Sequence, residues 1–83
     1  MKVEISRRAE KDLAKLETDM RNRIITELLD LENNIAGKDI RKLKGEKTFW
    51  RLRVGDYRVI MEIDQEWLVI TALHVAHRRE VYR

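Results

Sequence analysis

Residues 50–58 read Trp-Arg-Leu-Arg-Val-Gly-Asp-Tyr-Arg, and the fold can be worked out from this stretch. Apolar and basic residues alternate along its first half, which is typical of a strand with one buried face and one solvated face. The Gly55-Asp56 pair that follows predicts a two-residue hairpin turn. A turn of this length fixes the register of the two strands. The predicted cross-strand pairs are Val54 with Tyr57, Arg53 with Arg58, Leu52 with Val59, and Arg51 with Ile60.

Three arginines, Arg51, Arg53 and Arg58, share one face of this predicted hairpin. Arg53 and Arg58 are directly opposite each other, and like charges in that position destabilise a sheet. Guanidinium groups bind phosphate through two parallel hydrogen bonds and stay charged at any biological pH. The pattern therefore favours an anion-binding site, although a salt bridge to a neighbouring acidic residue remains the alternative for any single arginine.

The positive charge of the chain is unevenly distributed. The whole sequence has a net charge of +3, whereas residues 36–58 hold eight basic and three acidic residues, a net charge of +5. Residues 59–73 carry a net charge of −3, and residues 74–83 carry +2. Such segregation indicates a surface that binds a polyanion. For residues 38–47 taken alone, an ordinary solvated loop explains the charge equally well.

Length and composition limit the class of protein. A chain of 83 residues corresponds to one small domain, which we assign to residues 1–83. The absence of cysteine excludes disulfides and cysteine-based zinc sites. The first residues carry no signal-peptide pattern, and the longest apolar run, residues 67–70, is too short to span a membrane. We therefore expect a soluble, cytoplasmic protein with no metal and no cofactor.

The sequence before the hairpin predicts one strand and two helices. Residues 2–5 alternate as a short strand, and Ser6 is placed to cap the helix that follows. The second helix begins at Thr18 or Asp19, and Gly37 lies just past its expected end. The apolar positions with helical spacing are Ala9, Leu13 and Leu16 in the first helix and Met20, Ile24, Ile25, Leu28, Leu31 and Ile35 in the second.

Three strands are predicted in the second half, at residues 48–54, 57–64 and 67–76, after a basic connection anchored by Ile40 and Leu43. The last strand is apolar on both faces, which is typical of a central strand. This order predicts an α+β fold: a short N-terminal strand, an antiparallel two-helix hairpin and a three-stranded antiparallel meander, with the helices on one face of a twisted sheet. The predicted helix-facing residues are Trp50, Leu52, Val54, Tyr57, Val59, Met61 and Ile63.

The tail at residues 77–83 and His74 in the last strand are two further places with polar side chains. Antiparallel pairing returns the end of the last strand to the neighbourhood of Arg58, so the tail at residues 77–83 delivers further basic residues to the arginines. From its position alone, Tyr82 reads as a frayed terminal residue. His74 lies within an apolar run, and we interpret it as a core histidine with a satisfied hydrogen bond.

The segments 6–13, 43–45, 50–60 and 77–82 together resemble the RelE/ParE superfamily of toxins, and its RelE-type branch most closely. The resemblance covers essentially the whole chain, and its specificity lies in the combined order and spacing. It implies a toxin of a type II toxin–antitoxin module, an endoribonuclease that cuts messenger RNA in the ribosomal A site and inhibits translation. It also implies a hetero-oligomer with a RelB-type antitoxin.

The resemblance assigns roles to individual residues. Arg53, Arg58 and Arg78 would stabilise the charge that develops on the scissile phosphate, and Tyr82 would stack on or orient a base. We further assign RNA binding to Lys44, Lys47, Arg51, His77 and Arg79.

This sequence departs from the RelE-type pattern at Arg51 and Arg53, where those enzymes often have lysine. Arginine does not deprotonate at biological pH, so neither residue can act as a base. His77, Glu80 and Tyr82 are the remaining candidates for proton transfer, and positioning of the RNA by the ribosome would reduce the need for a base.

Two alternatives share the fold but not this chemistry. One is a ParE-type inhibitor that binds DNA gyrase and cuts no RNA, although ParE-like chains generally lack an arginine-rich hairpin combined with a terminal tyrosine. The other is a non-toxic member that binds only its antitoxin and operator DNA.

Overall fold

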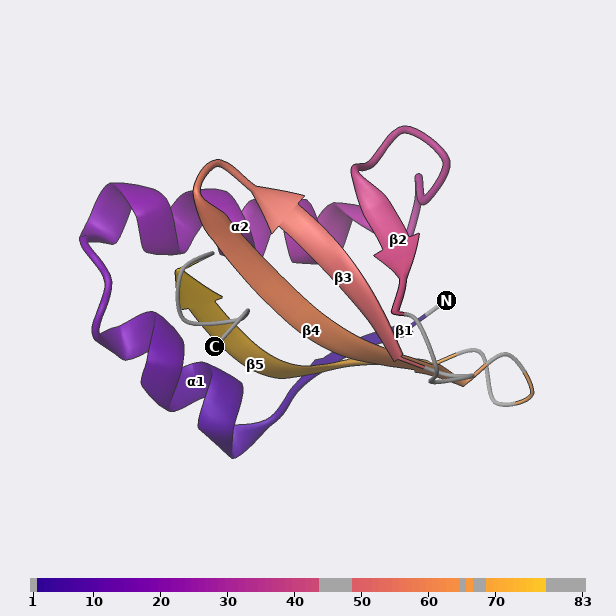
Figure 1. Ribbon diagram of the computed structural model, residues 1–83, viewed down its shortest axis with the longest axis horizontal. Helices are drawn as coiled ribbons and strands as arrows, with labels where there is room; N and C mark the ends of the chain where they lie inside the picture. The colour runs from indigo at the N-terminus through magenta and orange to yellow at the C-terminus, as the bar shows by residue number, and fades with distance from the viewer. Residues whose placement is uncertain (1, 44–48, 65, 67–68, 78–83) are drawn as a thin grey trace.

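The computed structural model describes residues 2–43, 49–64, 66 and 69–77. Two helices pack against a five-stranded sheet of order β1-β5-β4-β3-β2, which confirms the α+β class (Figure 1). In the part of the chain that the structure describes, no helix is long and apolar enough to cross a membrane. The elements are β1 (Lys2–Ile5), α1 (Arg7–Ala14), α2 (Thr18–Asp30), β2 (Ile40–Lys42), β3 (Phe49–Val54), β4 (Tyr57–Asp64) and β5 (Val69–His77).

The β3–β4 hairpin has the predicted register, and all four predicted cross-strand pairs are confirmed. Gly55 has a φ of 59°, in the left-handed region that glycine enters without steric cost. The turn chemistry therefore sets the register, and the register sets which face each side chain occupies.

The hydrophobic core lies on the side of the sheet that α2 covers. Ile24 and Leu28 of α2 are fully buried, and so are Leu52, Val59 and Met61 of the hairpin. Trp50 and Tyr57 are partly buried against this core. The predicted helix-facing side of the sheet is therefore confirmed.

Ser6 joins the start of α1 to β5. Its Oγ accepts a hydrogen bond from the Ala9 N–H at 3.1 Å, which confirms the predicted N-cap. The same hydroxyl donates to the Leu73 carbonyl at 3.1 Å, and the Ser6 N–H donates to the Ala72 carbonyl at 2.9 Å. This residue therefore fixes the position of α1 relative to the sheet.

The second helix ends earlier than predicted. It stops at Asp30, and Ile35, which was expected to complete its apolar stripe, lies outside it with 39% of its surface exposed. The Asn34 N–H returns to the Asp30 carbonyl at 2.9 Å, and the Asn34 Oδ1 accepts the Gly37 N–H at 3.2 Å. Asparagine competes for backbone hydrogen bonds in this way and favours turns over helix interiors.

The start of the basic connection after α2 is held to that helix by ion pairs. The Lys38 Nζ lies 2.6 Å from an Asp30 oxygen and 3.1 Å from a Glu27 oxygen, so the connection is tied to the end of α2. These hydrogen bonds, to Asp30 first and then to Glu27, raise the pKa of the Lys38 ammonium.

Residues 40–42 form the edge strand β2, where the sequence predicted only a connection. Its pairs with β3 are Ile40 with Leu52, Arg41 with Arg51, and Lys42 with Trp50. A strand of three residues is too short to show a recognisable alternation, which explains why it was missed. Ile40 packs against the core, as expected for an apolar anchor.

Strand β5 has two halves with different neighbours. β1 pairs with it in parallel along Val69–Ala72, so the sheet is mixed and this half of β5 is central, as predicted. Further along, Ile60 pairs with His74 but Met61 pairs with Ala72, which leaves Leu73 as the extra residue of a β-bulge. Because of the bulge, Ala72 and Val75 both face the core, and His74 faces the opposite side.

Candidate functional site

Four arginines lie on the side of the sheet opposite the core. Register places Arg53 directly opposite Arg58 and Arg41 directly opposite Arg51, and directly paired residues share a face. We call this set, Arg41, Arg51, Arg53 and Arg58, the arginine face. Arg41 was not predicted, because its membership depends on β2 being a strand.

The members of the arginine face differ in exposure. Arg41 and Arg53 are exposed, and the Arg53 Nε donates to the Gly55 carbonyl at 3.5 Å. The Arg51 side chain is only 11% exposed, with its Nη2 3.7 Å from the Asp39 carboxylate. Arg58 is 6% exposed. The expectation of three arginines on an open surface is therefore wrong in detail, because arginine can lay its long stem along the sheet and bury most of its area.

This arrangement places like charges opposite each other on neighbouring strands, which ordinarily destabilises a sheet. Two like-charged pairs lie directly across strands, and the Asp39 carboxylate forms an ion pair with Arg51. Charges interact more strongly where protein replaces water, so an anion held beside Arg58 would be attracted more strongly than at an exposed site. The face is therefore suited to hold phosphate.

Five predicted site residues lie outside the described residues. These are Lys44, Lys47, Arg78, Arg79 and Tyr82, and Glu80 lies there as well.

His77 is placed at the end of β5, opposite Tyr57. The two rings form an edge-to-face pair, with centroids 5.4 Å apart and an interplanar angle of 83°. The alternation of β4 places Tyr57 on the side of Val59, which faces the core. His77 therefore lies at the margin of the helix-covered side, and the structure does not bring it together with the arginine face.

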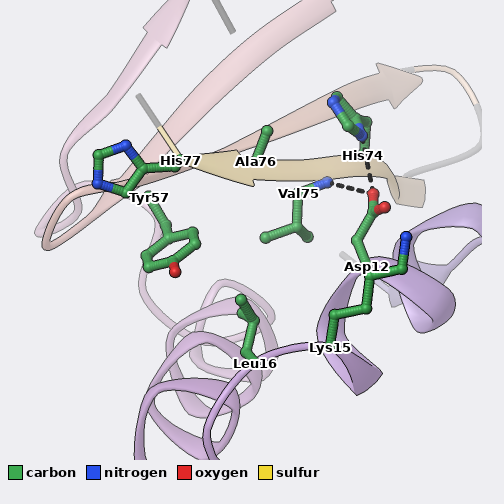
Figure 2. Close-up of a pocket in the computed structure, with 8 residues that line it drawn as sticks. All are labelled: Asp12, Lys15, Leu16, Tyr57, His74, Val75, Ala76 and His77. Carbon is green, nitrogen blue, oxygen red and sulfur yellow. Dashed lines mark hydrogen bonds and ion pairs between the residues drawn. The ribbon is translucent and has the colours of Figure 1, made fainter. Parts of the chain in front are cut away.

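A pocket of about 240 Å³ lies between α1 and the end of β5 (Figure 2). Asp12 of α1 and Lys15, the C-cap residue that follows this helix, contribute ionisable groups to its wall. The complete lining is Asp12, Lys15, Leu16, Tyr57, His74, Val75, Ala76 and His77. Among the residues that the structure describes, no group of three or more histidine, aspartate or glutamate side chains is placed to hold a metal ion.

Asp12 and His74 form a hydrogen-bonded pair at this pocket. The His74 Nδ1 lies 2.7 Å from the Asp12 Oδ2, and the same oxygen accepts the Val75 N–H at 2.9 Å. The predicted hydrogen bond of His74 is confirmed, but its side chain is 29% exposed and is not a core residue. Sequence reasoning missed Asp12, because one acidic residue beside Leu13 in a helix carries no signal of a partner 62 positions away.

Comparison with known proteins gives the family. The family described as "ParE toxin of type II toxin-antitoxin system, parDE" matches residues 3–82. A relative named Toxin RelE3, from Methanocaldococcus jannaschii, is 31% identical over 86 residues, which cover 99% of this chain and 96% of that protein.

Solved structures agree with this assignment. The RelB-RelE antitoxin–toxin complex from Methanococcus jannaschii contains a chain with a TM-score of 0.80 and 29% identity, covering 95% of this chain and 94% of that one. In the archaeal RelE-RelB complex from Pyrococcus horikoshii OT3, the corresponding values are 0.79 and 29%, with 93% of each chain covered. The chain therefore belongs to the ParE toxin family of type II toxin–antitoxin systems and is a toxin of the RelE/ParE superfamily.

Proposed function

We propose that this toxin is a ribosome-dependent endoribonuclease that cleaves messenger RNA in the A site and thereby inhibits translation in the cytoplasm. The observation that carries the proposal is the direct pairing of Arg53 with Arg58 on the side of the sheet away from the core. The likeness to proteins named RelE, over nearly the whole chain, supports it.

The chemistry of RNA cleavage by its own 2′-hydroxyl explains why arginines would be useful. The transition state carries extra negative charge on the non-bridging phosphate oxygens, and preorganised donors stabilise such charge best. Arg53 is exposed and able to meet an incoming phosphate, whereas Arg58 is held in place by burial. Arg51 would hold a neighbouring phosphate. In this proposal the tail adds Arg78 to the phosphate site and Tyr82 as a base-stacking residue.

The same proposal includes further predicted RNA contacts. Lys44, Lys47 and Arg79 would bind RNA around the site, and phosphate contacts of this kind position the substrate without reading its sequence. Codon choice would then depend on contacts with the bases or on the ribosome.

We further propose a RelB-type antitoxin as the partner of this toxin. The M. jannaschii and P. horikoshii structures that it resembles are complexes of RelE with RelB. An acidic antitoxin segment that covered the arginine face would neutralise it and exclude RNA. The resulting particle would be a hetero-oligomer.

A translation-dependent cleavage assay tests the proposed function. Purified wild type is added to ribosomes programmed with a defined message, and the cut sites are mapped by primer extension. We expect cuts within A-site codons, and we expect Arg53→Ala to reduce the rate by about 100-fold, the typical effect of removing one preorganised donor. Arg21→Ala is the matched control, because Arg21 lies on α2 and contacts Thr18.

A supercoiling assay with DNA gyrase separates the ParE-type alternative. Inhibition of gyrase by wild type, together with intact message on translating ribosomes, would show that the toxin is a gyrase inhibitor. A protein that neither inhibits gyrase nor cleaves messenger RNA, and that causes no growth defect when expressed without antitoxin, would be a non-toxic member.

A further inference from the structure

The arginine face holds no group that can accept a proton, because arginine stays protonated at biological pH. Cleavage nevertheless requires removal of the proton from the attacking 2′-hydroxyl. We propose that His74, oriented by Asp12, is the proton acceptor. This inference rests on the proposed nuclease function.

Sheet register places His74 beside the arginine face. His74 lies opposite Ile60 on β4, and Ile60 in turn lies opposite Arg51 on β3. Arg58 pairs with Ala76, two residues beyond His74 on β5. Arg58 and His74 are therefore diagonal neighbours on one face, a relationship that separates Cα atoms by about 7–8 Å and leaves long side chains within reach. A phosphate held by Arg58 would lie close to the imidazole.

Asp12 determines which nitrogen of His74 is free to accept a proton. An ionised carboxylate only accepts hydrogen bonds, so the 2.7 Å contact with the Asp12 Oδ2 requires the proton on Nδ1. In a neutral ring, Nε2 is then the acceptor. Figure 2 shows this second nitrogen on the far side of the ring from Asp12. The Val75 N–H, bonded to the same Asp12 oxygen at 2.9 Å, holds the carboxylate in this position.

His74 is also accessible, unlike a histidine that serves only the core. Its side chain is 29% exposed, and it lines the pocket beside α1. The chain has one other histidine, His77, and register places that residue opposite Tyr57 on the helix-covered side. His74 is therefore the histidine of this chain that shares a face with the arginines.

The groups around His74 that carry or change charge come from three elements. The α1 region contributes Asp12 and the C-cap residue Lys15, β4 contributes Arg58, Glu62 and Tyr57, and His77 lies on the same strand as His74. A test by substitution has to leave these groups in place, so that a change in pH dependence is assigned to His74 alone.

The 2′-oxygen forms a bond to phosphorus as its proton passes to the His74 Nε2, and the bond between phosphorus and the 5′-oxygen breaks. The 5′-oxygen takes a proton from solvent, and His74 later returns its proton to solvent. The products are a 2′,3′-cyclic phosphate and a 5′-hydroxyl, with no net change in protons.

The test compares single-turnover cleavage by wild type and His74→Gln on the same programmed ribosomes between about pH 5.5 and 8.5, across the range in which histidine changes charge. Glutamine can still donate a hydrogen bond to Asp12, so the connection between α1 and β5 is retained. We expect a loss of at least about 100-fold at high pH, the usual contribution of a general base. The wild-type rate should fall towards the acid end of this range, while the rate of the variant stays flat.

Asp12→Asn supplies a second, independent variant. An amide oxygen in place of Oδ2 can still accept both the Val75 N–H and the His74 Nδ1–H, but it carries no charge to stabilise the protonated ring, so we expect slower cleavage with an unchanged melting temperature. Glu10→Gln makes the same chemical change at an exposed position of α1 and should cleave like wild type.

The outcomes separate this inference from the proposed function. Wild-type cleavage combined with His74→Gln cleavage within about threefold of it at high pH, well below the usual effect of losing a general base, would overturn the role of His74 and leave the nuclease intact. A slow His74→Gln variant that keeps the wild-type pH profile would also overturn it, since such a residue only positions other groups. No cleavage by wild type on translating ribosomes would overturn both proposals.

Discussion

Arg41 of β2 lies directly opposite Arg51 of β3, so the arginine face continues to the edge of the sheet. Asp39 forms an ion pair with Arg51 but not with Arg41 in the described contacts, and Arg41 is exposed. The neighbouring Lys42 pairs with Trp50 and therefore points to the other side of the sheet. These two adjacent cations provide a direct test of whether the face binds RNA.

We expect Arg41→Ala to weaken RNA binding and Lys42→Ala to leave it nearly unchanged. Loss of one phosphate contact should lower the slope of log affinity against log salt concentration by about 1. Binding of a short single-stranded RNA, measured at several salt concentrations, provides the comparison. Equal salt slopes for the two variants would show that the edge of the arginine face does not contact RNA.

Messenger cleavage should tolerate neither the loss of Arg58 nor its replacement by lysine. Because it is 6% exposed, its contribution depends on a fixed guanidinium orientation, and lysine supplies a point charge without the two-pronged geometry. We expect Arg58→Ala and Arg58→Lys each to reduce messenger cleavage by about 100-fold or more. Circular dichroism has to show native secondary structure in both variants. Wild-type cleavage by a folded Arg58→Lys would show that charge alone suffices.

The ion pairs of Lys38 predict a loss of stability at high pH. Hydrogen bonds to Asp30 and Glu27 raise the pKa of Lys38 above its ordinary value of 10.5. A group whose pKa is raised by folding stabilises the native state fully below its unfolded pKa, and this contribution disappears as pH rises through the folded pKa. We therefore expect the urea midpoint of wild type to fall more steeply above pH 10.5 than that of Lys38→Gln. Parallel curves would assign no stabilising role to the Lys38 pairs.

Ser6 has two separable contributions to stability. Ser6→Ala removes both the helix cap and the hydrogen bond to the Leu73 carbonyl, and should cost about 2 kcal/mol of unfolding free energy. Ser6→Asp keeps the cap acceptor but removes the donor to Leu73, so it should lie between wild type and alanine. Urea denaturation gives the three values, and an aspartate variant as unstable as alanine would show that the bond to β5 dominates.

The parts of the fold that followed from the sequence are those set by neighbours in the chain. Gly55 and the alternation around it determined the hairpin, and Ser6 determined the start of α1, because turn and cap chemistry act over a few residues. The strand β2 and the end of α2 depend instead on which backbone groups find partners in the folded chain. Local patterns do not encode that choice.

The candidate site likewise combines features that follow from local sequence with features that depend on the folded structure. The shared face of Arg53 and Arg58 follows from the hairpin register, whereas the burial of Arg58 depends on how its side chain lies in three dimensions. The Asp12–His74 pair joins residues 62 positions apart across a β-bulge, and the bulge itself carries no clear signature in the sequence. Long-range polar pairs of this kind become visible only after the strands are placed.

The hydrogen bonds from Ser6 and Asp12 to β5 also bear on solubility. β1 stops pairing with β5 at Ala72, so in the described part of the chain the rest of that strand has no neighbouring strand on that edge. An exposed strand edge is a template for association with other chains, and proteins commonly block such edges. Here Ser6 bonds the Leu73 carbonyl and Asp12 bonds the Val75 N–H, so side chains of a helix occupy groups that a foreign strand would need. We therefore expect these contacts to hinder aggregation through this strand.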